Sequence, residues 1–517
     1  MAVYLYNVGW PGCSALSPAK QFSNYLFACF EQSSNMIDEK KSLSEAEGAA
    51  GLPDFSHIDE KKVLRKMDLR LIPIMSLLYL LAFLDRGNIG NAKIEGLEAD
   101  LGLSGSQYNW CLTVFFFPYA FFELPSNLVL SKMRPSIWFP LIMVAWGLVM
   151  TLMGIVHNYT DLLIARIFLG LAEAGLYPGV AFYITKWYCR HEAQLRQALF
   201  FSAASVAGAF SGLLAFAIAK MDGIAGLEGW RWIFILEGIL TVVVAVLAFF
   251  AIHDYPETAK FLTEEERDWV IHRLRYQYSD NAVDKGKFQW KYVKDALLDW
   301  QVYLALITWY GIVCPLYGIS FFLPTIIKDL GYTSSTAQLL TIPIYIVATL
   351  IAVLSAWLSD RQGQRSRLLF FHLLCIAAGY IVVIAASGRG VPGVVYFGTF
   401  VLVSGIYPAL PGTVTWLSNN LAGDYKRASG MAIQIGIGNF AGAMASNFYR
   451  AQDAPTYYLG HGVELGFAVF GLLAVIVLRV AYQRINKKRE ALALKHNYTP
   501  EELSKMGDRA PTFKYML

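Results

Sequence analysis

The apolar residues of this chain come in long uninterrupted runs rather than in the amphipathic patterns of soluble domains. A helix needs roughly 20 mostly apolar residues to cross a lipid bilayer, and twelve segments meet that requirement. These predicted spans are residues 71–92, 107–130, 136–156, 161–185, 197–219, 231–252, 301–327, 336–358, 368–387, 393–417, 428–448 and 463–482. The pattern therefore predicts an all-α membrane protein with twelve transmembrane helices.

The connections between the spans are short except for residues 253–300, which separate two blocks of six spans. The predicted parts are a cytosolic tail over 1–70, a six-helix bundle over 71–252, a cytosolic loop over 253–300, a second six-helix bundle over 301–482 and a cytosolic tail over 483–517. In the loop, Thr263 precedes Glu264-Glu265-Glu266, which is the pattern of a capping box. An amphipathic surface helix is therefore predicted to begin there and to continue to about Tyr278.

The composition agrees with a lipid surrounding. Hydrophobic residues make up 56% of the chain and charged residues only 16%, whereas soluble domains are about a quarter charged. The six cysteines are scattered without a CxxC pair, and no HExxH, P-loop or GxGxxG motif occurs. We therefore expect no enzyme activity, no metal ion, no cofactor and no nucleic-acid partner.

The placement of basic residues predicts the orientation of the chain. With both termini in the cytosol, the inner segments hold 34 Lys and Arg residues and the outer loops hold 6. This bias follows the positive-inside rule and favours both termini in the cytosol. The expected location is the plasma membrane, which the protein crosses several times. Residues 1–35 are mildly apolar but broken at Pro11-Gly12, and they fit neither a signal peptide nor a span. Translation from Met36 is an alternative start.

Charged residues inside spans are energetically costly, and this makes them candidates for function. We identify five, all in the first block: Asp85, Arg86, Glu123, Arg166 and Glu173. At 1.5 Å per residue, Arg166 lies about 7 Å and Glu173 about 18 Å below the outer boundary. Asp85 lies near the level of Arg166, so an ion pair between these two is feasible. Glu173 lies deeper and has no evident fixed partner.

These charges suggest how a proton and an anion could be linked. A carboxyl group in a medium of low dielectric constant is protonated more readily than one in water, because burial disfavours the charged form. Protonation of Glu173 or Asp85 would release an arginine to bind an anionic substrate. The alternative is that Asp85, Arg86, Arg166 and Glu173 form a structural network of salt bridges.

Other polar residues are candidate substrate contacts. Tyr119 and Glu123 lie four residues apart on one helix face and could line one cavity, although Glu123 could equally hydrogen-bond a neighbouring helix. In the second block, Tyr317, Asn419 and Gln434 lie in or at the ends of spans. Buried phenols and amides can orient a carboxylated ligand, and they can also hold helices together.

Small residues at a spacing of four indicate close helix packing. Gly208 and Gly212 lie on the fifth span, and Gly438 and Gly442 lie on the eleventh. Pro178 is expected to bend the fourth span.

A stretch after the eighth span, Ala356-Trp-Leu-Ser-Asp360-Arg361-Gln-Gly363-Gln-Arg365, resembles the inter-helix motif G-x-L-x-D-R-x-G-R of the major facilitator superfamily. The first glycine of the motif is alanine here, and the corresponding stretch after the second span lacks the aspartate. The resemblance implies a fold of two six-helix bundles. It also implies a gating role for Asp360, Arg361, Gly363 and Arg365.

Further stretches resemble the anion:cation symporter family, and in particular its fungal branch of allantoate, nicotinate, pantothenate and biotin permeases. They are Asp85-Arg86-Gly87-Asn88, Tyr119 with Glu123-Leu-Pro125, Arg166-Ile-Phe-Leu-Gly170-Leu-Ala-Glu173, Trp230-Arg231-Trp232-Ile-Phe-Ile-Leu-Glu237-Gly238 and Trp416-Leu-Ser-Asn419-Asn420. By this likeness Asp85 and Glu173 bind protons. Arg86, Arg166 and Tyr119 would contact the substrate.

The sequence thus predicts a secondary active transporter that couples protons to a small organic anion, such as nicotinate, pantothenate, biotin or allantoate. Its expected partners are this anion, protons and the lipid bilayer, and the chain is expected to be monomeric. An exporter of an acidic secondary metabolite is the first alternative. A non-transporting nutrient sensor is the second, and the short carboxyl-terminal tail argues against it.

Overall fold

The computed structural model describes residues 55, 57–130, 132–280, 290–362, 365–422, 424–493 and 506–517. Residues 1–54, which include the alternative start at Met36, lie outside the described residues. The first bundle contains α2 (Glu60–Ile94), α4 (Gly105–Leu130), α5 (Pro135–Met153), α6 (Tyr159–Glu173), α7 (Leu176–Trp187), α8 (Arg190–Ala219) and α9 (Gly229–Ala251). The second bundle contains α12 (Trp300–Asp329), α13 (Ser334–Gln362), α14 (Arg365–Ala386), α15 (Pro392–Asn420), α16 (Asp424–Gly438), α17 (Phe440–Ala445) and α18 (Tyr458–Ala493). No strand occurs among the described residues.

Helices occupy all twelve predicted spans, and the prediction of an all-α membrane fold is confirmed. Ten helical segments of the described chain are long and apolar enough to cross a membrane, with α6 and α7 counted together. The other two spans correspond to α4, which carries Glu123 and several other polar residues, and to the pair α16 and α17, which is interrupted at Asn439. Both of these regions are helical, as the apolar runs of the sequence predicted.

The fourth span is broken at its middle, where Pro178 was expected to bend it. α6 ends at Glu173 and α7 begins at Leu176. Proline has no N–H group, so the carbonyl of Ala174 cannot receive the helical hydrogen bond that residue 178 would normally donate. The break leaves the Glu173 side chain on the last turn of α6, facing α2.

Contacts between the two bundles involve α2 with α12, α8 with α13, and α4 with α17. One of the predicted glycine pairs, Gly208 and Gly212, lies at such a contact. A Cβ atom on Gly208 would come within 2.6 Å of the Tyr345 ring, and one on Gly212 would come within 2.6 Å of the Gln338 carbonyl oxygen. Both neighbours belong to α13, so the two glycines let α8 and α13 approach across the bundles.

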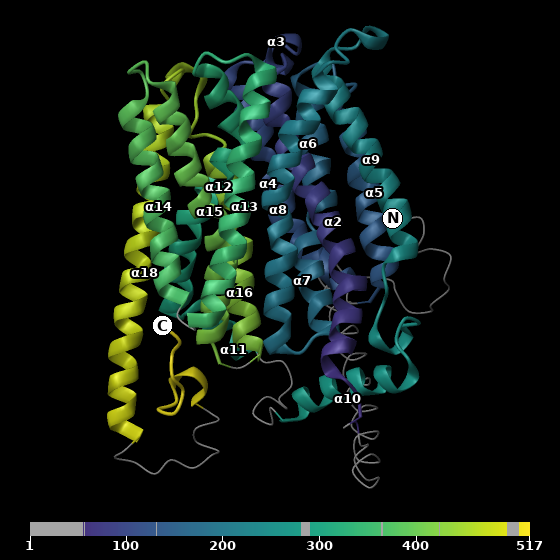
Figure 1. Ribbon diagram of the computed structural model, residues 1–517, viewed down its shortest axis with the longest axis vertical. Coiled ribbons are helices and arrows are strands. Elements are labelled where there is room, and N and C mark those ends of the chain that lie inside the picture. The colour runs from purple at the N-terminus through teal and green to yellow at the C-terminus, as the bar shows by residue number, and fades with distance from the viewer. Residues whose placement is uncertain are drawn as a thin grey trace, which may run out of the picture. The chain divides into compact units, whose positions relative to one another are not determined.

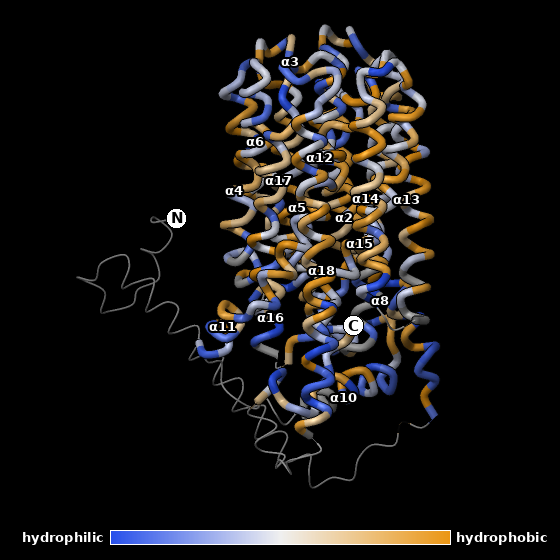
Figure 2. The backbone as a smooth tube through the Cα atoms, turned by 90° about the vertical axis from the view of Figure 1, so that its left-hand side faces the viewer, coloured by the Kyte–Doolittle hydropathy of each residue, from blue (hydrophilic) through white to orange (hydrophobic). Residues whose placement is uncertain are grey.

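The long helices run between two ends of the molecule. Figure 1 shows α3 (Leu97–Asp100) at one end, the α3 end, and α10 (Glu264–Asp280) at the other, the α10 end. In Figure 2 hydrophilic residues gather near α10 and α11 (Trp290–Leu297), while the long helices are largely hydrophobic. At the α3 end, the Ile94 carbonyl oxygen accepts hydrogen bonds from Lys328 Nζ at 2.7 Å and Ser334 Oγ at 2.8 Å. These bonds join the end of α2 to the second bundle.

In the loop between the bundles, α10 begins at Glu264, the position that the sequence predicted for a helix start. The backbone N–H of Thr263 donates to Glu266, and the N–H of Glu266 donates to the Thr263 hydroxyl at 3.3 Å, as in a capping box. The Glu266 carboxylate also forms an ion pair with Lys66 of α2. This ion pair attaches α10 to the first bundle.

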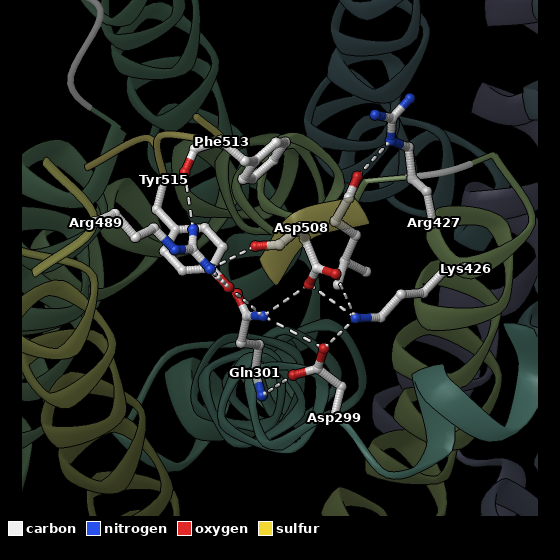
Figure 3. Close-up of polar contacts among 9 residues, drawn as sticks. Asp299, Gln301, Lys426, Arg427, Arg489, Asp508, Phe513 and Tyr515 are labelled. Atoms are coloured by element: carbon white, nitrogen blue, oxygen red, sulfur yellow. Dashed lines mark hydrogen bonds and ion pairs between the residues drawn. The ribbon is translucent and has the colours of Figure 1, made fainter. Parts of the chain in front are cut away.

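The last described segment, residues 506–517, packs against the α10 end of the second bundle (Figure 3). Lys426 of α16 forms ion pairs with Asp299, which caps α12, at 2.6 Å and with Asp508 at 2.8 Å. Gln301 lies beside them and donates to Asp508 at 3.4 Å. All four side chains are buried. We call Asp299, Lys426 and Asp508 the tail cluster.

Further hydrogen bonds hold the same segment to α15 and α18. Arg489 donates to the Phe513 carbonyl oxygen at 2.8 Å, and its guanidinium group lies 4.3 Å from the centre of the Tyr515 ring. The Asn420 side chain accepts from the Met516 N–H at 2.7 Å and donates to the Met516 carbonyl oxygen at 3.1 Å. These contacts connect four helices of the second bundle through one short segment.

Candidate transport site

Arg86 of α2 lies at the contact between the two bundles. Its Nη2 donates to the Glu173 carboxylate on α6, and its Nη1 donates to the Tyr317 hydroxyl on α12 at 2.9 Å. The Arg86 side chain is 9% exposed and that of Glu173 is 2% exposed. One guanidinium group therefore joins a carboxylate of the first bundle to a phenol of the second, away from bulk water.

Aromatic rings enclose the same guanidinium group. The Arg86 Cζ atom lies 4.9 Å from the centre of the Tyr119 ring, 5.2 Å from that of Phe115 and 6.0 Å from that of Tyr317. Such rings attract a cation through their negative faces and present flat apolar surfaces beside it. The Arg86 guanidinium group is therefore bordered by apolar ring surfaces from both bundles.

The structure gives Glu173 a partner that the sequence did not reveal. Depth estimates left this carboxyl group without an evident partner, but the break after α6 directs it to Arg86. Arg86, Tyr119, Glu173 and Tyr317 thus come together from four helices. All four were predicted as site residues.

The feasible ion pair between Asp85 and Arg166 does not form. The Asp85 carboxylate accepts from the Trp146 indole at 3.1 Å and from the Thr241 hydroxyl at 2.8 Å. Arg166 instead donates its Nε to the Cys111 carbonyl oxygen at 3.2 Å. The expectation was wrong because helix depth alone does not fix the direction in which a side chain points: Asp85 faces α5 and α9, whereas Arg166 faces α4.

The Arg166 side chain extends from α6 towards α4 and is fully buried. Its guanidinium group lies 5.4 Å from the centre of the Phe115 ring, and its two terminal nitrogens have no hydrogen-bond partner. Phe115 separates it from Arg86, since the same ring also contacts the Arg86 guanidinium group. Two cations therefore flank one aromatic ring, and only Arg86 reaches the second bundle.

Glu123 forms a separate contact between the bundles. Its Oε2 accepts a hydrogen bond from the Asn439 amide at 2.9 Å, at the break between α16 and α17. Both alternatives for Glu123 remain compatible with this position, because it joins neighbouring helices and lies one turn from Tyr119.

The other predicted residues lie away from Arg86. The buried Gln434 donates to the Ala305 carbonyl oxygen at 3.3 Å, near the beginning of α12. Asn419 lies at the end of α15, next to the Asn420 that holds residue 516. Neither is brought next to the guanidinium group.

The predicted gating motif can be followed only in part. Gly363 lies outside the described residues, as do the side chains of Asp360 and Arg361. Arg365 begins α14, and its backbone N–H donates to the Leu517 carbonyl oxygen at 3.1 Å. The motif thus ends beside the segment that carries the tail cluster.

Two cavities lie at the contact between the bundles. One, of about 20 Å³, is lined by residues of α2, α8, α12 and α13, including Gly87, Asn91, Ser211 and Ser320. The other, of about 30 Å³, is lined by α7, α8 and α15, including Tyr177 and Gln197. Gly87 directly follows Arg86, and Tyr177 lies one turn beyond Glu173. The Arg86–Glu173 pair is therefore adjacent to the lining of both cavities.

Sequence reasoning missed two carboxyl groups that the structure buries completely. Glu237 lies inside the sixth predicted span, so the rule that selected the other five charges could have found it. It accepts a hydrogen bond from Asn88 and is 2% exposed. Glu464 was placed at the edge of the last span, but α18 begins six residues earlier, and Glu464 is fully buried.

Comparisons with known proteins place the chain among membrane transporters. A family model described as Major Facilitator Superfamily matches residues 75–446. The MFS-type transporter cnsO of Penicillium expansum is 36% identical over 503 residues, with 93% of this chain and 95% of the relative covered. The high-affinity nicotinic acid transporter of Saccharomyces cerevisiae is 33% identical over 489 residues, with 94% and 90% covered.

Solved structures show the same fold at low sequence identity. The proton:xylose symporter XylE of this superfamily has a TM-score of 0.60 at 14% identity, with 78% of this chain and 94% of the other covered. A bacterial homologue of the human lysosomal transporter Spinster also has a TM-score of 0.60 at 16% identity, with 83% and 98% covered. At these identities the likeness concerns the fold alone.

Proposed function

Because this chain belongs to the Major Facilitator Superfamily, a superfamily of transporters rather than enzymes, we propose that it couples protons to the movement of a small organic anion. The observation that carries the proposal is the buried contact of Arg86 with Glu173 and Tyr317. It combines an anion-binding group, a titratable group and a contact with the second bundle in one place.

The contact sets up a competition for the guanidinium group. While Glu173 is ionised, it neutralises Arg86 and occupies donors that a substrate carboxylate needs. When a proton binds to Glu173, the carboxylic acid no longer forms the ion pair, and the donors of Arg86 become free for the substrate. Proton and anion then favour each other's binding by the same factor, as linkage requires.

The surroundings of Arg86 favour a particular substrate class. A bidentate arginine donor suits a carboxylate, and the rings of Phe115, Tyr119 and Tyr317 suit a flat or partly apolar body attached to it. Nicotinate, pantothenate, biotin and allantoate have such carboxylates. The relative named as a high-affinity nicotinic acid transporter supports this class.

The distribution of basic residues supports a direction for the chain in the membrane. The loop that contains α10 and the segment after α18 belong to the segments that carry 34 of the Lys and Arg residues. The α10 end is then cytosolic, the α3 end faces the outside, and the protein lies in the plasma membrane as a monomer.

Uptake of radiolabelled nicotinate, pantothenate, biotin and allantoate by yeast cells that express the protein tests the proposal. We expect accumulation of at least one acid when the outside is more acidic, and loss of accumulation when an uncoupler removes the proton gradient. Accumulation that is insensitive to the uncoupler would contradict proton coupling. Release of preloaded acid against its gradient would instead support the export alternative.

The variant Glu173→Gln tests the role of the pair. Glutamine keeps the size of the side chain but cannot be ionised, so Arg86 stays available at every pH. We expect gradient-driven accumulation to fall at least tenfold, while exchange of labelled for unlabelled acid persists. Glu228→Gln is the matched control, because this half-buried glutamate directly precedes α9 and pairs locally with Arg231. Wild-type accumulation in Glu173→Gln would refute the assignment.

A further inference from the structure

Two buried carboxyl groups share the contact between α2 and α9. Asp85 accepts from Thr241 of α9, and Glu237 of α9 accepts from Asn88 of α2. Asp85 and Asn88 are three residues apart, and Glu237 and Thr241 are four apart, so the carboxyl groups lie on successive turns of the same helix contact. Their exposed fractions are 1% and 2%.

Neither carboxyl group has a cation. Their hydrogen-bond donors are the Trp146 indole, the Thr241 hydroxyl and the Asn88 amide, all of them neutral. Within the described part of the chain, no Lys, Arg or His forms an ion pair with Asp85 or Glu237. One oxygen of each group, Asp85 Oδ1 and Glu237 Oε1, has no hydrogen-bond partner although it is fully buried.

The charged groups nearby do not compensate. The titratable group of α2 that faces Glu237 is Asp85. Arg86, the next residue of α2, does not neutralise the pair because it is bound to Glu173 of α6. The groups that α5 and α8 contribute, Trp146 and Ser211, are neutral. Two negative charges without a cation are very costly in such a place, so at least one carboxyl group must carry a proton.

A row of hydrogen bonds leads from Glu237 to the smaller of the two cavities between the bundles. Asn88 donates to Glu237 and accepts from the Ser211 hydroxyl at 3.4 Å, and Asn91 donates to Ser211 at 2.7 Å. Ser211 and Asn91 line the cavity. The row is a polar route between the buried carboxyl group and the space between the bundles.

We propose that Glu237 shares proton binding with Asp85, which the family likeness already indicates as a proton site, and that this pair exchanges protons with the cavity. This inference rests on the proposed function and extends it: Glu173 governs Arg86, whereas the Asp85–Glu237 pair takes up a proton inside the first bundle. Uptake converts one carboxylate to a neutral carboxylic acid. Release returns the proton to the cavity, and no bond other than O–H forms or breaks.

Infrared spectroscopy of the purified protein tests proton binding without any substrate. A protonated carboxyl group has its own C=O stretching band, distinct from the bands of carboxylates. We expect Glu237→Gln to remove part of the band that the wild-type protein shows at neutral pH, because glutamine keeps the acceptor for Asn88 and cannot be protonated. The control Glu228→Gln leaves the band unchanged. A wild-type band in Glu237→Gln overturns the proposal.

A second variant keeps the test decisive if Glu237→Gln does not fold. Asn88→Ala leaves the carboxyl group in place and removes its hydrogen-bond donor. We expect the band to persist and to move to higher frequency, because a carbonyl without a hydrogen bond vibrates faster. A band that does not move would place the proton on a different residue and overturn the assignment to Glu237.

Transport measurements separate this inference from the proposed function. A proton moved down a gradient of one pH unit supports about a tenfold accumulation of substrate. If the pair carries a proton in each cycle, Glu237→Gln lowers the accumulation ratio about tenfold at that gradient while uptake stays sensitive to the uncoupler. Uncoupler-insensitive uptake by the wild-type protein contradicts the proposed function alone, because the infrared result still decides proton binding. Unchanged accumulation in Glu237→Gln overturns a role of the pair in the cycle.

Discussion

The contact between α2 and α9 and the α10 end of the second bundle each bury a pair of carboxyl groups, but with different partners. Asp85 and Glu237 are bonded only by neutral donors. In the tail cluster, Asp299 and Asp508 lie on either side of the Lys426 ammonium group. Burial is nearly the same in the two places, with exposed fractions of 1% and 2% against 6% and 4%.

The difference teaches that burial alone does not decide what a carboxyl group does. Next to a buried ammonium group the charged form is favoured, and the aspartates serve to hold elements together. Among neutral donors the charged form has little support, and proton binding becomes the cheaper state. Buried carboxyl groups thus stabilise the packing at the α10 end of the second bundle, whereas those inside the first bundle bind a proton.

The largest expected effect comes from removing the ammonium group of the tail cluster. Lys426→Met leaves Asp299 and Asp508 buried beside each other without a cation. Breaking a buried pair in this way costs about 3–5 kcal/mol. We expect a clear fall in the apparent melting temperature of the purified protein in detergent, measured by loss of the monodisperse peak after heating.

The matched control is Lys514→Met, which removes an exposed ion pair with Glu490 from the same segment. Exposed pairs contribute little, so the melting temperature should hardly change. Adding Asp508→Asn to Lys426→Met should restore part of the lost stability, since it removes one of the uncompensated charges. Equal stability of Lys426→Met and Lys514→Met would contradict a structural role of the tail cluster.

A smaller effect on stability is expected from Asp85→Asn. The substituted amide keeps an oxygen that accepts from Trp146 and Thr241. Because no cation depends on Asp85, the change in stability should stay within about 1 kcal/mol. In the same heating assay Asp508→Asn, which takes a charge from Lys426, should be clearly less stable than Asp85→Asn. If Asp85→Asn were the less stable of the two variants, the contrast between the tail cluster and the Asp85–Glu237 pair would be contradicted.

The smallest effect concerns the attachment of α10. Burial by itself raises the pKa of Glu266, but the hydrogen bond from Lys66 and the N–H of Thr263 outweigh it, so the pKa is lowered. A lowered pKa stabilises the attachment above the ordinary pKa of glutamate, and this stability is lost as the pH falls through the folded-state value. Lys66 is more than one third exposed, so screening limits the contribution to less than about 1 kcal/mol.

Limited proteolysis of the region around α10 measures this attachment. Cleavage in the wild-type protein should become slightly faster as the pH falls through the acidic range, while Glu266→Gln should be cleaved at a rate that no longer depends on pH there. Glu265→Gln, a change on the same turn, is the control. Equal pH dependence in Glu266→Gln and the control would exclude the ion pair as the cause.

The fold could be predicted because lipid imposes a simple rule on sequence. All twelve spans were found, but two helix ends were misplaced. The beginning of the first helix was predicted too late, because α2 begins at Glu60, and the end of the last helix was predicted too early, because α18 continues to Ala493. These extensions are polar, and hydropathy reports where a helix leaves the apolar runs rather than where it ends. The capping box predicted a helix end more accurately than hydropathy did, since Thr263 directly precedes the first residue of α10.

The site could be predicted residue by residue but not pair by pair. Arg86 and Glu173 were identified from the cost of burying charge, yet their contact depends on how α2 and α6 are rotated, and depth along a helix carries no such information. The expected partner of Arg166 was wrong for this reason. The tail cluster was not foreseen at all, because Asp508 lies in a polar tail whose sequence gives no sign of burial.

One helix, α12, belongs both to the tail cluster and to the contact with Arg86. α12 is capped by Asp299 of the tail cluster and carries Tyr317, whose hydroxyl touches Arg86, about 27 Å further along the axis. It is a nearly enclosed rod, interrupted in its hydrogen bonding by Pro315 just before Tyr317. The tail cluster and the contact with Arg86 are therefore joined by a single helix, and the position at which that helix lacks a backbone hydrogen bond, Pro315, lies between them.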